Sequence, residues 1–415
     1  MRIFFIVLLL AMLTACEKAP VWPGSLESLL ASQPERFATV MQDPAKYRVQ
    51  IMYTQIDREA DNKPVFKTFI YRVNPGEYFY PASTVKLPVA ALALEKLNRL
   101  NLPGLDTDTT MLTGAAADFQ TEAKTDETSP TGLPSVGQYV RKILLVSDND
   151  AFNRLYEFLG QYEINERLHG MRYFDTRIIH RLESSLSEEE NRWANPVQFI
   201  NGDEIVYTQD RVYSETSYRG AQPELLGLAE IVDGGRVERP KDFSGKNAYA
   251  LLDQHEFIKN LVFPESADPR KRLALSDDDY RFLYRYMSMY PGESDIDAYS
   301  NAQEYPEGYV KFLMYGGDAK SIPSHIRIFN KVGDAYGFLT DTAYIVDFNN
   351  NIEFILSATI YTNENQTFND DTYEYKEIGL PFLRNLGQAI YEIELGRHRE
   401  NKPDLSRFRF PGRDY

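Results

Sequence analysis

The sequence has a single cysteine, Cys16, among its 415 residues, so no disulfide can form within the chain. Neither the metal-binding spacing His-Glu-x-x-His nor the nucleotide-binding loop Gly-x-x-x-x-Gly-Lys occurs. The five histidines are scattered along the chain: His169, His180, His255, His325 and His398. A formal charge of −16 argues against a nucleic-acid partner. We therefore expect no metal, no cofactor and no nucleic acid, and we expect a monomer.

The N-terminus has the pattern of an export signal. A basic Met-Arg start precedes an apolar run over residues 3–12, which is too short to span a bilayer, and then Leu-Thr-Ala-Cys. Cys16 resembles the lipidated cysteine of bacterial lipoproteins, although a cleaved signal beside an unmodified cysteine gives the same pattern. We predict a signal peptide over residues 1–15, a tether over 16–24, and a protein lipid-anchored on the periplasmic side of a membrane or on the cell surface.

Local patterns predict an α+β fold. Apolar spacing indicates an outer helix over residues 26–41, and β-branched and aromatic residues indicate a hairpin over 47–56 and 65–73. The remaining predictions are loops over 101–133, helices over 87–100, 136–145, 150–159, 161–168 and 378–395, and strand-rich runs over 326–339 and 342–360. This order indicates an antiparallel sheet of about five strands flanked by helices, with an all-helical subdomain. We expect one domain over 25–400, with an insertion around 200–320, and a tail over 401–415.

Ser83 is the only serine in the chain that is followed by a lysine three positions later. Because the predicted helix starts there, Ser83 and Lys86 share one helix face. A lysine can take the proton of a serine only if its pKa falls from about 10.4 towards neutrality, which costs roughly 4 kcal/mol. Burial, the helix dipole and a second cation would all lower that pKa. Taken alone, Ser83 could equally be a helix cap.

Two further motifs follow in the sequence. Ser147-Asp148-Asn149 lies between two predicted helices, where its hydroxyl and amide could face a cleft or could simply cap a helix. Lys331-Val332-Gly333 lies on a predicted strand and precedes Asp334. Its glycine would permit close backbone approach, and its lysine would supply positive charge.

The three motifs together resemble those of class A β-lactamases and their penicillin-binding relatives, which have Ser-x-x-Lys, Ser-Asp-Asn and Lys-Thr-Gly in this order. The resemblance implies that Ser83 is acylated by a β-lactam or a related amide and that Lys86 is a candidate base. Ser147 would pass a proton to the leaving nitrogen, Asn149 would orient the substrate, and Lys331 would attract its carboxylate. The backbone N–H groups of Ser83 and Asp334 would hold the oxyanion.

Glu183 is the candidate for activating the water that removes the acyl group. It lies 36 residues after Ser147 in a segment that resembles the family's Ω-shaped loop, although a solvated glutamate is an equal alternative. Two residues depart from the family pattern. Ser187 replaces an asparagine that helps to hold this water, and Val332 lacks a hydroxyl whose hydrogen bond to the substrate is worth about 1 to 3 kcal/mol.

These departures leave three functions open. The first is a β-lactamase-like serine hydrolase. The second is a penicillin-binding-like peptidase or esterase that acts on peptidoglycan peptides. The third is a non-catalytic envelope protein that uses the same fold to bind a ligand.

Overall fold

The computed structural model describes residues 21–318 and 320–413. The predicted signal peptide, Cys16 and most of the predicted tether lie outside the described residues. Among those that are described, no helix is both long and apolar enough to cross a membrane.

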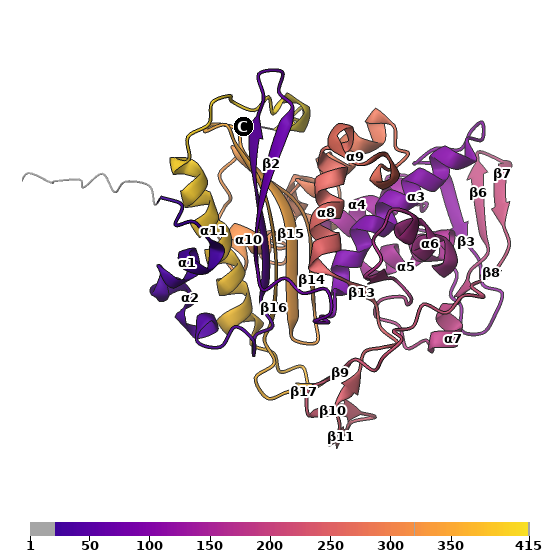
Figure 1. Cartoon of the computed structure of the whole chain (residues 1–415). Helices are drawn as coiled ribbons and strands as arrows, with labels where there is room; N and C mark the ends of the chain where they lie inside the picture. The colour runs from indigo at the N-terminus through magenta and orange to yellow at the C-terminus, as the bar shows by residue number, and fades with distance from the viewer. Residues whose placement is uncertain (1–20, 319, 414–415) are drawn as a thin grey trace, which may run out of the picture.

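Five antiparallel strands form the central sheet, in the order β14-β15-β16-β1-β2 (Figure 1). The strands are β1 (Gln50–Arg58), β2 (Pro64–Tyr71), β14 (Ile326–Ala335), β15 (Phe338–Asp347) and β16 (Ile352–Tyr361). The sheet therefore joins the first part of the chain to the last, and the predicted α+β class with about five strands is confirmed.

The predicted division of residues 326–360 into two strand-rich runs is wrong, because three strands form. β14 and β15 are joined by Tyr336 and Gly337, which both have a positive φ (55° and 81°), as a tight two-residue hairpin turn requires. A second turn around Asn351, whose φ is 54°, separates β15 from β16. Tyrosine is uncommon in the left-handed region, so the first turn carries no clear sequence signal.

Helices from the two ends of the chain cover one face of the sheet (Figure 1). They are α1 (Leu26–Ala31), α2 (Pro34–Met41) and α11 (Leu380–Gly396). Two helices replace the single outer helix predicted over residues 26–41, because Pro34 interrupts it. Pro34 occupies the first turn of α2, where a backbone N–H has no partner within the helix, so the missing N–H costs no hydrogen bond. An apolar cluster fills the space between these helices and the sheet.

The other face carries the helical subdomain and the larger apolar cluster. Its helices are α3 (Lys86–Leu100), α4 (Val136–Val146), α5 (Asn149–Leu159), α6 (Gln161–Gly170), α8 (Leu251–Val262) and α9 (Asp277–Met287). A short strand, β3 (Thr110–Thr113), lies within the predicted loop over 101–133 and pairs with β6 (Val197–Asn201), which also pairs with β7 (Glu204–Gln209).

Residues 200–320 are not simply a peripheral insertion, because α8 and α9 belong to the core. His255 of α8 is buried between Thr54 on β1 and Ser357 on β16, at 2.7 and 2.8 Å. Short strands in this region form a projection at the lower edge of Figure 1. They are β9 (Leu225–Leu226), β10 (Ala229–Val232), β11 (Gly235–Val237) and β12 (Lys241–Asp242), with β17 (Thr367–Phe368) beside β10.

The predicted boundaries at both ends need correction. Phe408, in the predicted tail, is fully buried and packs on Phe329 and Tyr344 at ring distances of 5.3 and 5.0 Å. Trp22, in the predicted tether, packs on Phe69 at 4.7 Å. Large aromatic side chains bury enough apolar surface to fix such terminal segments on the domain.

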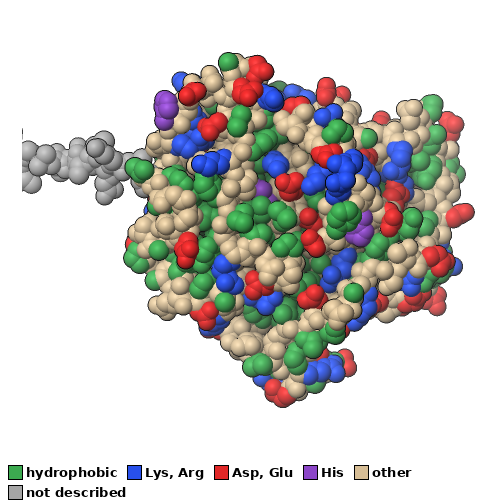
Figure 2. All heavy atoms as spheres, viewed as in Figure 1, with side chains coloured by type: hydrophobic (Ala, Val, Ile, Leu, Met, Phe, Trp, Pro, Cys, Tyr) green, Lys and Arg blue, Asp and Glu red, His purple; other side chains and the backbone are tan. Residues whose placement is uncertain are grey.

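Side chains of both charges share the surface. On the face shown in Figure 2, Lys and Arg side chains lie among Asp and Glu side chains over most of the outline. This face therefore presents no extended field of one sign.

We predict that His255 makes the fold sensitive to acid. Burial lowers its pKa from 6.5 to about 3, so the folded protein keeps this ring neutral while the unfolded chain binds a proton below pH 6.5. The contribution of neutral His255 to the free energy of unfolding is complete above pH 6.5 and is lost as the pH drops towards 3. The loss is about 2 kcal/mol at pH 5. Thermal unfolding at pH 8 and pH 5 should show a smaller loss for His255→Gln than for the unchanged chain. An equal loss in the two proteins would contradict this assignment.

Candidate active site

Ser83 lies in a tight 3-10 turn, Ala82–Val85, that leads directly into α3. It is half-buried, and its hydroxyl makes no hydrogen bond to another described residue. Ala82, immediately before it, has a φ of 47°, which strains a residue that has a Cβ. The turn therefore holds a free serine hydroxyl at the N-terminal end of a buried helix.

Lys86 is fully buried one turn after Ser83. Its Nζ donates to Oδ1 of Asn149 at 2.5 Å, to Oγ of Ser147 at 3.3 Å, and to the backbone carbonyl of Ser147. Burial lowers the pKa of Lys86 well below its ordinary value, and the positive charge of Lys331 lowers it further, against the opposing effect of three carboxylates. A lowered pKa is the shift that a lysine needs to act as a general base.

Ser147 lies where α4 ends and the chain turns into α5. Its φ of 59° is left-handed, and Asp148 caps α5 by accepting from the N–H of Ala151 at 2.7 Å. Lys86 and Lys331 both donate to its Oγ, the latter at 2.8 Å. When both lysines donate, they occupy both acceptor sites of this oxygen. The hydroxyl proton of Ser147 is then left for a third partner in the cleft.

Lys331 is buried on β14, and its Nζ also donates to the carbonyl of Val332 at 2.9 Å. Burial lowers its pKa to about 7, while Asp334 and Asp341 oppose this shift. The cleft therefore holds two buried amines that share one serine, and each of them binds protons less tightly than a free lysine does.

A third buried lysine, Lys311, lies behind Lys331 and was not predicted. It donates to the carbonyl of Met287 at 2.6 Å and to Oδ1 of Asn330 at 2.7 Å, and Asn330 donates to Asp341 at 2.8 Å. Burial lowers the pKa of Lys311 to about 7 and raises that of Asp341 to about 6. The sequence signal that could have indicated this network is Lys311 itself, the one charged residue in the otherwise apolar run from Val310 to Met314.

Gly333 brings β14 against the turn that carries the nucleophile. A Cβ at this position would lie 2.5 Å from the carbonyl oxygen of Pro81 and 2.8 Å from the backbone nitrogen of Ser83. Only glycine fits so close an approach. The backbone of Ser83 and that of Asp334, the next residue on the strand, are therefore close neighbours, as the predicted oxyanion site requires.

Val332 is not placed as a substrate contact. Its side chain is only 2% exposed and lies in the apolar cluster on the α11 side of the sheet. Alternation along the strand directs this side chain into the core.

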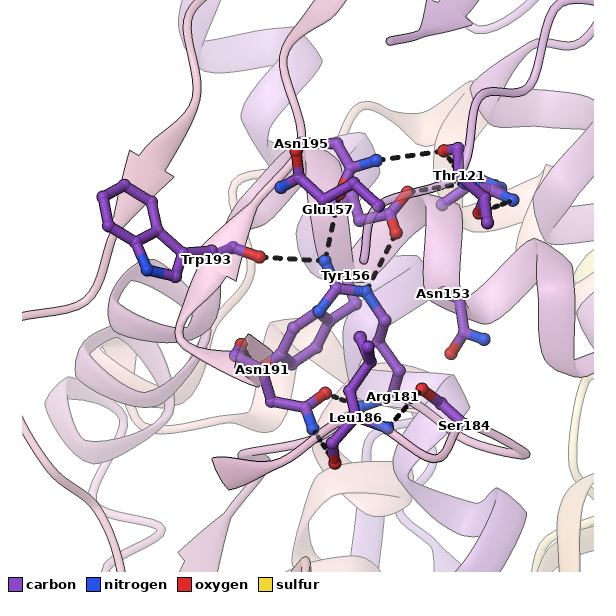
Figure 3. A network of polar contacts seen from close by, with 12 residues as sticks. Thr121, Asn153, Tyr156, Glu157, Arg181, Ser184, Leu186, Asn191, Trp193 and Asn195 are labelled. Carbon is purple, nitrogen blue, oxygen red and sulfur yellow. Dashed lines mark hydrogen bonds and ion pairs between the residues drawn. The ribbon is translucent and has the colours of Figure 1, made fainter. Parts of the chain in front are cut away.

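The loop that carries Glu183 is held by a buried arginine (Figure 3). Arg181 pairs with Glu157 on α5 at 2.9 Å and donates to the carbonyl of Trp193 at 2.9 Å. The N–H of Leu182 donates to Oδ1 of Asn153 at 2.8 Å. These contacts fix the loop immediately before Glu183.

Glu183 itself is not hydrogen-bonded to the reactive groups. It is exposed, its φ is 47°, and it makes no hydrogen bond to another described residue. Ser187 caps the short helix α7 (Glu188–Asn191) through a reciprocal pair of hydrogen bonds with Glu190. Neither side chain is therefore bound to Ser83 or Lys86, although the charge of Glu183 acts on Lys86 from a distance.

Metal ligands are not clustered in the described part of the chain. Among residues 21–318 and 320–413, no group of three or more His, Cys, Asp or Glu side chains could hold a metal ion. The polar groups at Ser83 are two amines, a hydroxyl and an amide, which suit proton transfer.

A family model described as the β-lactamase enzyme family matches residues 35–219. The match is slightly shorter than half of the chain. It covers Ser83, Lys86, Ser147 and Asn149 and ends before Lys331. Over these residues the chain is similar to the β-lactamase enzyme family, which confirms the resemblance inferred from the motifs.

Solved structures of the same kind are similar at low sequence identity. A β-lactamase from Sphaerobacter thermophilus is 14% identical, with 88% of this chain and 95% of that chain covered and a TM-score of 0.47. PBP-A is 14% identical over 90% and 98% of the two chains, with a TM-score of 0.49. A β-lactamase from Streptomyces albus G is 15% identical over 88% and 98%, with a TM-score of 0.44. No curated protein sequence matches the chain.

We predict that Lys331→Met slows the reaction of Ser83 and moves its rising pH limb to higher pH. The positive charge that lowers the pKa of Lys86 is lost, and Ser147 loses a charged donor worth a factor of about 10 to 100. Labelling by a fluorophosphonate, which reacts with activated serines, should be followed from pH 5 to pH 10. The exposed Lys402→Met provides the matched control, and an unchanged pH limb in Lys331→Met would refute the coupling.

Proposed function

We propose that the chain is a cell-envelope hydrolase that forms an acyl-enzyme at Ser83 with an amide or a related carbonyl compound. The observation that carries this proposal is Lys86, which is buried one turn from Ser83 with a strongly lowered pKa. A protein that only binds a ligand has no need for a buried lysine of lowered pKa beside a free serine hydroxyl.

In this proposal, Lys86 takes the proton of Ser83 as Oγ attacks the carbonyl carbon. The negative charge that develops on the carbonyl oxygen lies between the backbone N–H groups of Ser83 and Asp334, a stabilisation worth a few kcal/mol. Ser147 then gives its proton to the leaving atom, which breaks the scissile bond, and Ser147 recovers a proton from the lysines that bind it. Asn149 keeps Lys86 in place through its 2.5 Å hydrogen bond.

We infer that the acyl group leaves slowly, as in a penicillin-binding protein. Two features support this: Glu183 is exposed and makes no hydrogen bond to Ser83 or Lys86, and the side chain of Ser187 is engaged in capping α7. The proposed substrates are therefore peptidoglycan peptides or related esters, with β-lactams as slow acylating agents. Lipidation at Cys16 and an envelope location complete the proposal and rest on the sequence pattern alone.

The first test is intact mass spectrometry of the full-length protein in detergent after prolonged incubation with a fluorescent penicillin. We expect a slowly formed, persistent adduct that is absent from Ser83→Ala. Rapid drug consumption with a transient adduct would contradict slow deacylation. The absence of both an adduct and drug loss would count against acylation by β-lactams.

A second test concerns Glu183. Because this side chain is exposed and not bound to the reactive groups, Glu183→Gln should change the lifetime of the acyl-enzyme by less than about twofold. The lifetime is measured as the loss of adduct mass after the free drug is removed, with Glu189→Gln on the following helix α7 as the control. A lifetime at least tenfold longer in Glu183→Gln alone would make Glu183 the deacylating base.

A further inference from the structure

A second cavity lies outside the cleft, where residues 74–79 meet the short strands β4 (Thr176–Arg177) and β13 (Ala248–Tyr249). Its volume is about 450 Å³, which is within the range of cavities that bind small molecules. Among the described residues that line it, none is a candidate catalytic or substrate-binding residue of the cleft. The cavity is therefore a separate candidate binding site.

Arg177 presents a guanidinium group to this cavity without an ionic partner. Its Nε donates to the carbonyl of Lys246 at 3.1 Å, and the group lies over the ring of Tyr78 at 5.7 Å. Nη2 is buried without a hydrogen bond, and Nη1 makes none to another described residue either. A half-buried cation that lacks an anion is costly, so an anionic group on a ligand would stabilise it.

The other cationic groups of the lining are already engaged. Arg219 pairs with Asp242 at 2.8 Å. His169 donates from Nε2 to a backbone carbonyl at 2.8 Å. Arg177 is therefore the cation of this cavity that a ligand can bind.

Two carboxylates of the same lining also lack ionic partners. The side chains of Asp175 and Glu224 make no hydrogen bond or ion pair with another described residue. The third acidic side chain, Glu77, lies 3.8 Å from Arg72. Since Asp175 and Glu224 line the same cavity as Arg177 and do not pair with it, a ligand that carries both charges can bind between them.

Aromatic rings form another part of the wall. Phe174 is 70% exposed, and its ring lies 6.4 Å from that of His169. Tyr218 meets the same histidine edge-on at 5.9 Å. Small-molecule sites commonly combine such apolar rings with a few polar groups that fix the orientation of the ligand.

We propose that this cavity binds a small zwitterion, namely an amino acid or a short peptide with a free amine and a free carboxylate. The carboxylate binds Nη1 of Arg177, since arginine favours carboxylate partners. The ammonium group binds Asp175 and Glu224, and an apolar side chain packs on Phe174. This inference does not depend on acylation of Ser83.

The test uses three dipeptides that differ only in their terminal charges. Glycyl-phenylalanine is a zwitterion, its N-acetyl derivative keeps the carboxylate alone, and its C-terminal amide keeps the amine alone. Binding to the full-length protein in detergent is measured at pH 7 by isothermal titration calorimetry. We expect the zwitterion to bind about tenfold or more tightly than either derivative, because each derivative loses one charged hydrogen bond.

Two variants assign the charges to residues. Arg177→Met should reduce the affinity for the zwitterion to about that for the amide. The double variant Asp175→Asn and Glu224→Gln should reduce it to about that for the acetylated peptide, and it gives an independent test if Arg177→Met does not fold. Arg281→Met, which removes an exposed arginine of α9, is the matched control and should leave all three affinities unchanged.

The possible failures are distinguishable. Equal affinities for the three dipeptides, or no binding at about 10 mM, would overturn the site. A preference for the zwitterion that survives in both variants would overturn the roles of Arg177 and the two acids. Binding that is lost in Lys331→Met but kept in Arg177→Met would place the peptide in the cleft, which would overturn this inference and leave the acyl-enzyme at Ser83 standing.

Discussion

The placement of two buried lysines around one serine hydroxyl is the constraint on which the rest of this site depends. Lys86 and Lys331 both donate to Ser147, and burial makes the charged form of each amine costly. The positive charge of Lys331 adds to this cost at Lys86. The packing of three separate elements, α3, the α4–α5 turn and β14, must hold the two lysines in place against this cost. The outcome is a lysine beside Ser83 whose pKa is well below its ordinary value.

The backbone around the nucleophile meets a second constraint, which is close approach. Gly333 lets β14 lie against the Ala82–Val85 turn, and the positive φ of Ala82 directs the chain into α3 at this point. These features are held by the sheet on one side and the helical subdomain on the other. The oxyanion donors thus depend on the fold as a whole, while the side chains beside them are free to vary.

The sequence predicted the larger elements because their signals are local. Apolar periodicity located the helices and the first hairpin, and motif spacing located Ser83, Lys86, Ser147, Asn149 and Lys331. It failed where long-range packing decides. The hairpin turn at Tyr336 needs a left-handed tyrosine, which is uncommon. Helix α8 belongs to the core, because its His255 binds two strands, although the sequence predicts an insertion there. The last residues are predicted to be a tail, but Phe408 is in the core.

The sequence by itself determined that Ser83 and Lys86 lie one turn apart, because the helical repeat fixes that spacing whatever surrounds it. The tertiary structure alone decided that Lys331, 184 residues after Ser147, comes within 2.8 Å of it. It also decided that Glu183 is exposed and that Asp334 has no ionic partner among the described residues. Proton affinity and exposure depend on how much water and charge remain near a group after folding, which no local pattern records.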